Sequence, residues 1–373
     1  MRTFGKTALV GGLAFFFLCG ALGACSTGAA PSATASSAAS GPASLATLAQ
    51  QAKSEKGLVM YANVPNQYFK PVIAAFNKQY PDISVQVSTL EDNTIFSKYE
   101  AEAAQGARTA DLLVASAPAS WVQAEQNGVP AAVTPAGLSA FPSWVNQGHG
   151  VYVMSAEPML LGYNAKLLTP SEVPHTWAQL AADAKADPAK YRMVSYPISN
   201  TLDYAGVYGL IHLLGAQKTW SYFDALAPVT KTYNEGLDQL TQVLQGSASL
   251  GYMTSGLAQG ALQQYKGIAG YVFMQDATPL VPRGIAVTAK AASPASAQLF
   301  LDFLYSDAGQ QALCAGGFEA TMNGFQPATG CTASLTSLAT QVPTASTYLV
   351  PIDQPVLDQQ ASITASWNQA FKR

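Results

Sequence analysis

The hydrophobic positions of this chain alternate between short patterns typical of buried strands and longer patterns typical of helices. Residues 58–62 read LVMYA, which predicts a buried strand, and residues 65–80 then place large apolar side chains at helical spacing. Residues 83–87 alternate like a strand, residues 94–105 carry an apolar helical face, and residues 111–115 form another apolar run. Strands that alternate with helices predict a sheet of the α/β class.

The same alternation continues through the second half of the chain. Strands are expected over residues 159–163, 249–252, 268–274 and 284–288, and helices over residues 176–185, 200–214 and 236–245. A further helix is expected to begin at Pro294 with Ser293 as its N-cap, because proline suits the first helical position. Pro279 and Pro282 stand between the last two expected strands.

The amino-terminal residues have the pattern of an export signal. Arg2 and Lys6 precede an apolar run of about 15 residues, which is shorter than the roughly 20 residues that a membrane-spanning helix needs. The run ends in LGAC at residues 22–25, which resembles the lipobox of bacterial lipoproteins. We therefore predict a signal peptide over residues 1–24 and a lipid anchor on Cys25, and an ordinary export signal that contains a cysteine is the alternative.

The segment after Cys25 is predicted to be a linker. Residues 25–44 carry no charge and no large apolar side chain, so they cannot bury enough surface to fold. The folded part is expected to begin near Leu45. Loss of Arg2 and Lys6 with the leader changes the formal net charge from −3 to −5, and no basic run follows, so nucleic acid is not an expected partner.

Length and cysteine usage add two expectations. The 329 residues from 45 to 373 exceed what one hydrophobic core usually serves, so two lobes are expected. Cys314 and Cys331 are the cysteines that follow Cys25, and outside the cytoplasm they are predicted to form a disulfide. Two free buried thiols are the alternative.

Five motifs in this order resemble a known family. They are LVMYA at 58–62, FNKQYP at 76–81, ADLL at 110–113, GYN at 162–164 and GIAVTAKAASPASAQLFLDFLYSDAGQQAL at 284–313. The last is the most specific. Together they are similar to bacterial extracellular solute-binding proteins that feed ABC importers, and within that family to the ferric-iron and related cluster.

The resemblance implies a two-lobed periplasmic-binding-protein fold of type II, with discontinuous lobes and hinge crossings. Lobe 1 would hold residues 45–154 plus 284–330, lobe 2 would hold residues 155–283, and residues 331–373 would pack across both. The implied protein is an extracytoplasmic monomer without cofactor that captures a small polar solute and delivers it to an ABC permease in the membrane.

Polar residues near the ends of the expected strands are the candidates for ligand binding, because ligands collect at the carboxyl ends of strands in α/β sheets. They are neutral amides, hydroxyls and aromatics with few carboxylates. The predicted set is Asn63, Asn93, Thr94, Ser116, Glu157, Asn200, Thr201, Tyr204, Tyr252, Ser255 and Asp276.

Two cues disagree about the charge of the solute. Asn200 and Thr201 open a helix, and the free N–H groups there favour an anion. Asp203 lies in the same first turn and would repel an anion. The sequence leaves the charge open.

Ferric iron is the alternative ligand that the resemblance raises. The pair of adjacent tyrosines typical of the iron-binding branch is absent at residues 252–257, and Val64-Pro65 stands where an early histidine is often found. An organic solute is therefore predicted, and no metal site is assigned.

A sensory role, in which closure is read by a membrane signalling partner, is a further alternative. Catalysis is not predicted, because the chain has no G-x-S-x-G and no glycine-rich phosphate loop, and His149, His175 and His212 are far apart. A secreted hydrolase with another arrangement is the remaining alternative.

Overall fold

The structure, a computed structural model, describes residues 44–234, 236–329, 331 and 333–372. The predicted signal peptide, Cys25 and the linker up to residue 43 lie outside the described residues. Within the described ranges, no helix combines the length and the apolar character needed to cross a membrane.

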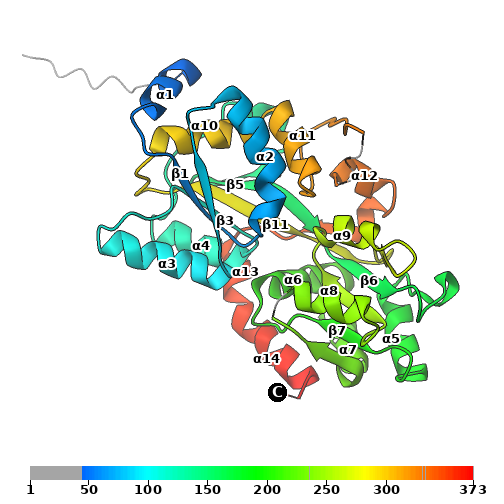
Figure 1. The fold of residues 1–373 in the computed structure, drawn as a ribbon. Coiled ribbons are helices and arrows are strands. Elements are labelled where there is room, and N and C mark those ends of the chain that lie inside the picture. Colours follow the sequence, from blue (N-terminus) through cyan, green and yellow to red (C-terminus); the bar gives the residue numbers. More distant parts are fainter. Residues whose placement is uncertain (1–43, 235, 330, 332, 373) are drawn as a thin grey trace, which may run out of the picture. The chain divides into compact units, whose positions relative to one another are not determined.

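A seven-stranded sheet forms the first half of the architecture (Figure 1). Its strand order is β2-β1-β3-β11-β5-β4, and β12 pairs with β11. The first three strands are parallel, whereas β11 is antiparallel to both β3 and β5. The strands are β1 (Leu58–Ala62), β2 (Val85–Thr89), β3 (Leu112–Ala115), β4 (Asn146–Gly148), β5 (Val151–Pro158), β11 (Thr278–Val287) and β12 (Thr347–Leu349).

Helices cover both faces of this sheet, as expected for an α/β fold. One face carries α2 (Asn66–Gln79), α10 (Pro294–Leu304) and α11 (Asp307–Ala315), whose apolar side chains form a core with alternate strand residues. The other face carries α3 (Asp92–Ala104) and α4 (Pro118–Gln126), which bury Phe96 and Trp121. Helix α1 (Leu45–Ala52) packs against α10. The helices predicted over residues 65–80 and 94–105 are confirmed, although α3 begins two residues earlier than predicted.

Strand β11 is longer than the sequence predicted, because it runs through Pro279 and Pro282 instead of beginning at residue 284. Pro282 faces Ala156 of β5 on one side. On its other side, β12 pairs with residues 278–280 and β3 with residues 284–287, so none of the described strands stands opposite Pro282 there. A proline without an N–H is tolerated there because no ladder bond is lost.

Strands β5 and β11 pair over most of their length, with a register shift between Arg283 and Gly284. These two strands contain residues 153–158 and 278–283, the segments in which the family resemblance implied hinge crossings. The predicted lobe boundaries after residues 154 and 283 fall inside these two strands.

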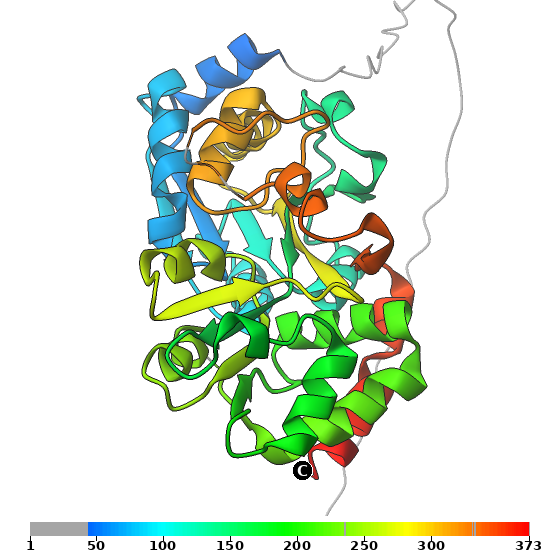
Figure 2. The ribbon, with the colours of Figure 1, turned by 90° about the vertical axis from the view of Figure 1, so that its right-hand side faces the viewer.

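A five-stranded sheet in the order β10-β6-β9-β7-β8 forms the second half of the architecture. Most of its green elements lie in the lower part of Figure 2. Helices α5, α6 and α7 share one apolar cluster with Met193 of β7, whereas α8 packs its Val243 against Val194 on the opposite face. Adjacent strand residues point to opposite faces, which places these helices on different sides of the sheet. The elements are β6 (Leu160–Asn164), α5 (Trp177–Ala186), β7 (Met193–Ser195), α6 (Thr201–Leu214), α7 (Ala216–Leu226), β8 (Thr230–Thr232), α8 (Gly236–Leu244), β9 (Leu250–Thr254), α9 (Ala258–Gln264) and β10 (Ala269–Val272).

The carboxyl-terminal segment contacts elements of both sheets. After α12 (Leu335–Ala339), strand β12 pairs with β11, and α13 (Gln354–Asp358) packs against α4. Helix α14 (Gln360–Ala370) packs against α6 and α7 and buries Trp367 among their apolar side chains.

The predicted disulfide between Cys314 and Cys331 is confirmed. The two Cα atoms are 5.5 Å apart, and Cys314 is buried with Ala320, Phe325 and Ala333. The bond ties the end of α11 to the loop that precedes α12.

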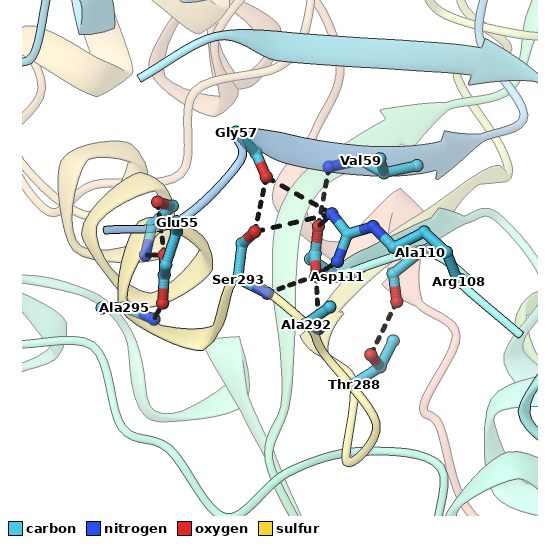
Figure 3. Close-up of polar contacts among 11 residues, drawn as sticks. Glu55, Gly57, Val59, Arg108, Ala110, Asp111, Thr288, Ala292, Ser293 and Ala295 are labelled. Carbon is cyan, nitrogen blue, oxygen red and sulfur yellow. Dashed lines mark hydrogen bonds and ion pairs between the residues drawn. The ribbon is translucent and has the colours of Figure 1, made fainter. Parts of the chain in front are cut away.

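The start of α10 is held by carboxylates from other elements, as Figure 3 shows. The helix begins at Pro294 as predicted, but the side chain of Ser293 makes no cap; its hydroxyl donates to the carbonyl oxygen of Gly57. The N–H groups of Ala295 and Ser296 donate instead to the carboxylate of Glu55, at 3.0 and 2.8 Å. A distant glutamate therefore supplies the cap that the sequence assigned to the local serine.

Candidate functional site

A pocket of about 510 Å³ is lined by residues that follow strands of both sheets. The seven-stranded sheet contributes the segments after β1 and β2 and one residue of β11; the five-stranded sheet contributes the segments after β7, β8 and β9. Ligands bind at such carboxyl ends in α/β proteins. The lining residues are Asn63, Val64, Pro65, Tyr68, Thr89, Leu90, Glu91, Asp92, Thr94, Tyr196, Asn200, Leu202, Asn234, Leu240, Thr254, Ser255, Leu257, Ala258, Ala261 and Arg283.

Arg283 is a buried cation at the wall of this pocket, with 2% of its surface exposed. Its guanidinium forms an ion pair with Glu157, which is 1% exposed, and donates to the side-chain oxygen of Asn63. Burial lowers the pKa of Arg283 to about 9, and the nearby charge of Asp92 opposes that shift, so the group is protonated at neutral pH. The charge of Arg283 is therefore matched inside the protein.

Asp92 is the carboxylate that joins the two sides of the pocket. Its Oδ1 accepts from the N–H of Ser116 at 3.0 Å, and its Oδ2 accepts from Nδ2 of Asn63 at 3.0 Å and from the hydroxyl of Thr201 at 2.7 Å. Burial raises the pKa of Asp92, and the bond from Thr201, the charge of Arg283 and the remaining bonds oppose that rise. Because the amide and backbone groups can only donate, this network favours the ionised carboxylate.

Two further hydrogen bonds link the two sides. The hydroxyl of Ser255, which follows β9, donates to Glu157 of β5. Nε2 of Gln259 in α9 donates to Glu319 at 2.7 Å, and burial raises the pKa of Glu319 to about 8. Glu319 follows α11 on the side of the seven-stranded sheet.

The start of α6, which the sequence offered as an anion site, is capped by its own chain. Oδ1 of Asn200 accepts from the N–H groups of Leu202 and Asp203 at 3.0 and 3.4 Å. Asp203 is 1% exposed, and burial raises its pKa to about 8. Its carboxyl group is therefore turned into the protein. The sequence had suggested instead that this group would face the ligand, and that expectation was wrong.

The structure brings four predicted site residues to the pocket wall, namely Asn63, Thr94, Asn200 and Ser255. Three more stand directly behind the wall. Ser116 and Thr201 donate to Asp92, and Glu157 pairs with Arg283 and Ser255.

The other four predicted residues lie elsewhere. Asn93 is exposed and lines a separate small cavity beside α4, because one helical step from Asp92 turns the side chain away. Asp276 accepts from the N–H of Trp177 at 3.0 Å and so holds the start of α5. Tyr204 is buried and donates to the carbonyl oxygen of Val356 in the carboxyl-terminal segment.

Tyr252 is a core residue on the face of β9 that is turned toward α5 and α7. Its ring packs on Trp177 and Phe223, and its hydroxyl contacts that of Thr230 at 3.1 Å. Thr254, two residues further on, contributes to the pocket wall at the end of the strand.

Sequence reasoning did not include Asp92 and Arg283 in the predicted set. Asp92 belongs to the segment 92–94, which follows an expected strand and was a candidate loop, but only Asn93 and Thr94 of that segment entered the set. Arg283 was expected near the cleft together with Arg192, but it was left out of the set because an arginine there could equally be a surface residue. A signal existed in both cases, since a charged residue beside expected strand ends is uncommon in a chain with 11% charged residues.

Among the described residues, no group of three or more histidine, cysteine, aspartate or glutamate side chains gathers where it could hold a metal ion. The pocket wall combines apolar side chains with amides, hydroxyls, two carboxylates and the guanidinium of Arg283, which is paired with Glu157.

Comparison with known proteins identifies the family. Residues 62–311 match the family described as bacterial extracellular solute-binding protein, which is more than half of the chain. No curated protein matches the chain in sequence. The chain belongs to the bacterial extracellular solute-binding proteins, and the predicted family is confirmed.

Solved structures support the fold. The substrate-binding protein of an ABC transporter from Agrobacterium tumefaciens is 22% identical with a TM-score of 0.76, over 85% of this chain and 96% of that one. Iron-bound HitA from Pseudomonas aeruginosa is 18% identical with a TM-score of 0.68, over 84% and 99%. AfuA from Actinobacillus pleuropneumoniae, a periplasmic binding protein with fructose-6-phosphate bound, is 17% identical with a TM-score of 0.68, over 85% and 98%.

The fold is therefore the type II periplasmic-binding-protein fold, as predicted. Family membership implies a small solute as ligand, an ABC permease as partner and a location outside the cytoplasm. It also places the chain among binding proteins and not among enzymes.

Proposed function

We propose that this chain is a lipid-anchored extracytoplasmic receptor that captures a small polar solute and delivers it to an ABC importer. The observation that carries the proposal is the pocket of about 510 Å³, because residues from both sheets line it. A cavity of this size is typical of sites for small molecules. The polar contacts would come from Asn63, Asp92 and Thr94 on one side and from Asn200 and Ser255 on the other.

The two sheets with their helices would act as two lobes that close over the solute. Lobe 1 would comprise residues 45–154 and 284–330, lobe 2 residues 155–283, and residues 331–373 would bind to both. The hydrogen bonds from Thr201 to Asp92 and from Gln259 to Glu319 support this proposal, since both join lobe 2 to lobe 1. A solute favours closure only through higher affinity for the closed state, so it must contact both lobes.

A thermal-shift screen tests solute capture. We expect at least one compound among amino acids, polyamines, sugars, phosphonates, organophosphates and ferric chelates to raise the melting temperature. A ligand at a hundred times its dissociation constant adds about 2.7 kcal/mol to the free energy of unfolding. A response to ferric chelates alone would select iron as the ligand, and no response from any compound would contradict solute capture.

Matched asparagine variants control that screen. Asn200→Ser shortens a side chain that lines the pocket while serine retains the ability to cap α6, so the affinity for the hit should fall. Asn93→Ser makes the same change outside the pocket and should leave the affinity unchanged. Equal affinities in both variants would place the ligand elsewhere.

Lipid attachment to Cys25 is a separate expectation. In cells of the source organism, the intact chain should fractionate with membranes and incorporate labelled fatty acid, because acyl chains on an amino-terminal cysteine supply the membrane affinity. Cys25→Ser should lose the label and leave the membrane fraction. Recovery of the unaltered chain without label would contradict the anchor.

A further inference from the structure

Glu319 places a buried carboxyl group at a contact between the two sides of the molecule. It follows α11 and is 3% exposed. Its Oε1 accepts from Nε2 of Gln259 in α9, which is 4% exposed, at 2.7 Å. Neither residue lines the pocket, so this contact joins the proposed lobes 1 and 2 without involving the solute site.

The surroundings of Glu319 favour the neutral, protonated acid. Oε2 of its carboxyl group is buried and has no hydrogen-bond partner among the described residues, and the side-chain donor that reaches Oε1 is the neutral amide of Gln259. A buried carboxylate with so few donors is costly, because burial penalises the charged form of the group. Burial accordingly raises the pKa of Glu319 to about 8, and the bond from Gln259 opposes that rise.

The strands next to Glu319 do not supply a charge that would stabilise its ionised form. The N–H of Glu319 donates to the hydroxyl of Ser155 in β5 at 3.0 Å, and Ser155 pairs in register with Arg283 of β11. Glu157 of β5 and Arg283 of β11 are the charged side chains of these two strands. They form an ion pair with each other, and neither of them shifts the pKa of Glu319.

The helices around Glu319 do not supply such a charge either. Helix α9 has no charged residue, and the charged residue of α11 is Asp307, at the opposite end of that helix. From α2, the rings of Tyr68 and Phe69 pack on Phe318, the residue before Glu319. Within the described part of the chain, Glu319 therefore forms no ion pair.

Separation of the two sides would reverse this preference. Gln259 belongs to the proposed lobe 2, so its withdrawal would open the carboxyl group of Glu319 to water. A glutamate in water has a pKa near 4.5, so Glu319 would release its proton to the solvent at neutral pH. Closing the two sides would take up that proton again, which links closure to protonation.

We propose that the contact between Gln259 and Glu319 is a proton-dependent latch, which holds the two lobes together while Glu319 is protonated and weakens when Glu319 ionises. This inference rests on the proposed closure of two lobes, and it adds a control of closure that lies outside the pocket. The stabilisation of the closed form is fully present below about pH 4.5. The ratio of open to closed molecules should rise by up to about tenfold for each pH unit from there to about pH 8, and then level off.

Small-angle X-ray scattering across this pH range tests the latch without a solute, because the proton is the probe. The described residues form one compact unit, so the chain can be studied from residue 25 onward, with Cys25→Ser to leave out acyl groups. We expect a larger radius of gyration at about pH 8.5 than at about pH 5.5. Circular dichroism at each pH separates opening from unfolding. The same radius of gyration at both values would overturn the latch.

Glu319→Gln is the decisive variant. Glutamine has the shape of the protonated acid and its side-chain oxygen can accept from Gln259, but it does not ionise. The variant should therefore keep the smaller radius of gyration at about pH 8.5. Histidines titrate in the same range, so a pH response that persists in Glu319→Gln would assign the opening to other groups and overturn the latch.

Asp203→Asn is the matched control. Asp203 is also buried and its pKa is also raised to about 8, but its carboxyl group accepts from Ser195 within the five-stranded half. The pH response should persist in this variant, and its loss there would contradict the role of Glu319.

Gln259→Leu decides the result if Glu319→Gln fails to fold. The substitution removes the donor to Glu319, so opening should occur at lower pH than in the unaltered protein. An unchanged pH profile in Gln259→Leu would be evidence against the latch. The two proposals fail separately, because scattering without a pH response leaves solute capture in place, whereas a thermal-shift screen without a hit contradicts solute capture whatever the scattering shows.

Discussion

Replacing Arg283 with methionine is expected to lower the free energy of unfolding by about 3–5 kcal/mol, which is the usual cost of removing one member of a buried ion pair. Glu157 is 1% exposed and would lose its cationic partner while staying out of reach of water. Asn63 would lose its donor as well. Urea unfolding monitored by circular dichroism gives this difference directly.

The double variant Arg283→Met with Glu157→Gln is the matched control. Neutralising the glutamate removes the uncompensated charge, so the double variant should be more stable than Arg283→Met alone. A single variant as stable as the unaltered protein would show that Arg283 is solvated, which contradicts its burial. A double variant no more stable than the single one would show that packing, and not charge, dominates.

Replacing Asp111 with alanine is expected to cost a similar amount, about 3–5 kcal/mol, because it removes a fully buried carboxylate whose donors would lose their partner. Asp111 is 0% exposed. It accepts from the N–H groups of Val59, Ala292 and Ser293, each at 2.8 Å, and from both terminal nitrogens of Arg108 (Figure 3). One side chain thus ties β1 and the start of β3 to the loop before α10.

Arg108→Met is the control for this prediction. The side chain of Arg108 is 39% exposed, and its loss leaves Asp111 with three backbone donors, so the cost should be only about 1 kcal/mol. Neither residue lines the pocket, so solute affinity should not change in Arg108→Met. Equal losses of stability in the two variants would contradict the central role of Asp111.

Much of the fold could be predicted from periodicity. Strands such as β1 and β3 are continuous apolar runs, and α2 and α10 show a clear helical face, so their existence follows from side-chain burial alone. Strand β11 could not be predicted in full because Pro282 is tolerated only where the described partner strands leave one edge of β11 open. The open edge beside Pro282 depends on how β3 and β12 pair with β11, and the sequence of β11 itself does not reveal it.

Only part of the candidate site could be predicted, namely the residues whose place follows from the ends of predicted strands and helices. Asn63 directly follows β1, and Asn200 directly precedes α6. Their positions along the chain are therefore enough to predict that both lie at the pocket. Tyr252 and Tyr204 were misplaced because aromatic side chains near a strand end or helix start are equally suited to the core, and only tertiary packing decides. Arg283 depends on Glu157 and Asn63, which are more than a hundred residues away, and local sequence does not reveal such partners.

The fold that this chain shares with its structural neighbours does not fix its ligand. AfuA is described with fructose-6-phosphate bound, which carries a phosphate. Here the guanidinium at the wall is matched by Glu157, and Asp92 stands beside it. Shared fold therefore does not predict a shared ligand.

A crystal structure of the protein with the solute found in the screen is the most direct test. We predict that the solute occupies the 510 Å³ pocket and contacts Asp92 on one side together with Asn200 or Ser255 on the other. A solute bound outside this pocket, or held by residues of one side only, would contradict capture between the two sheets.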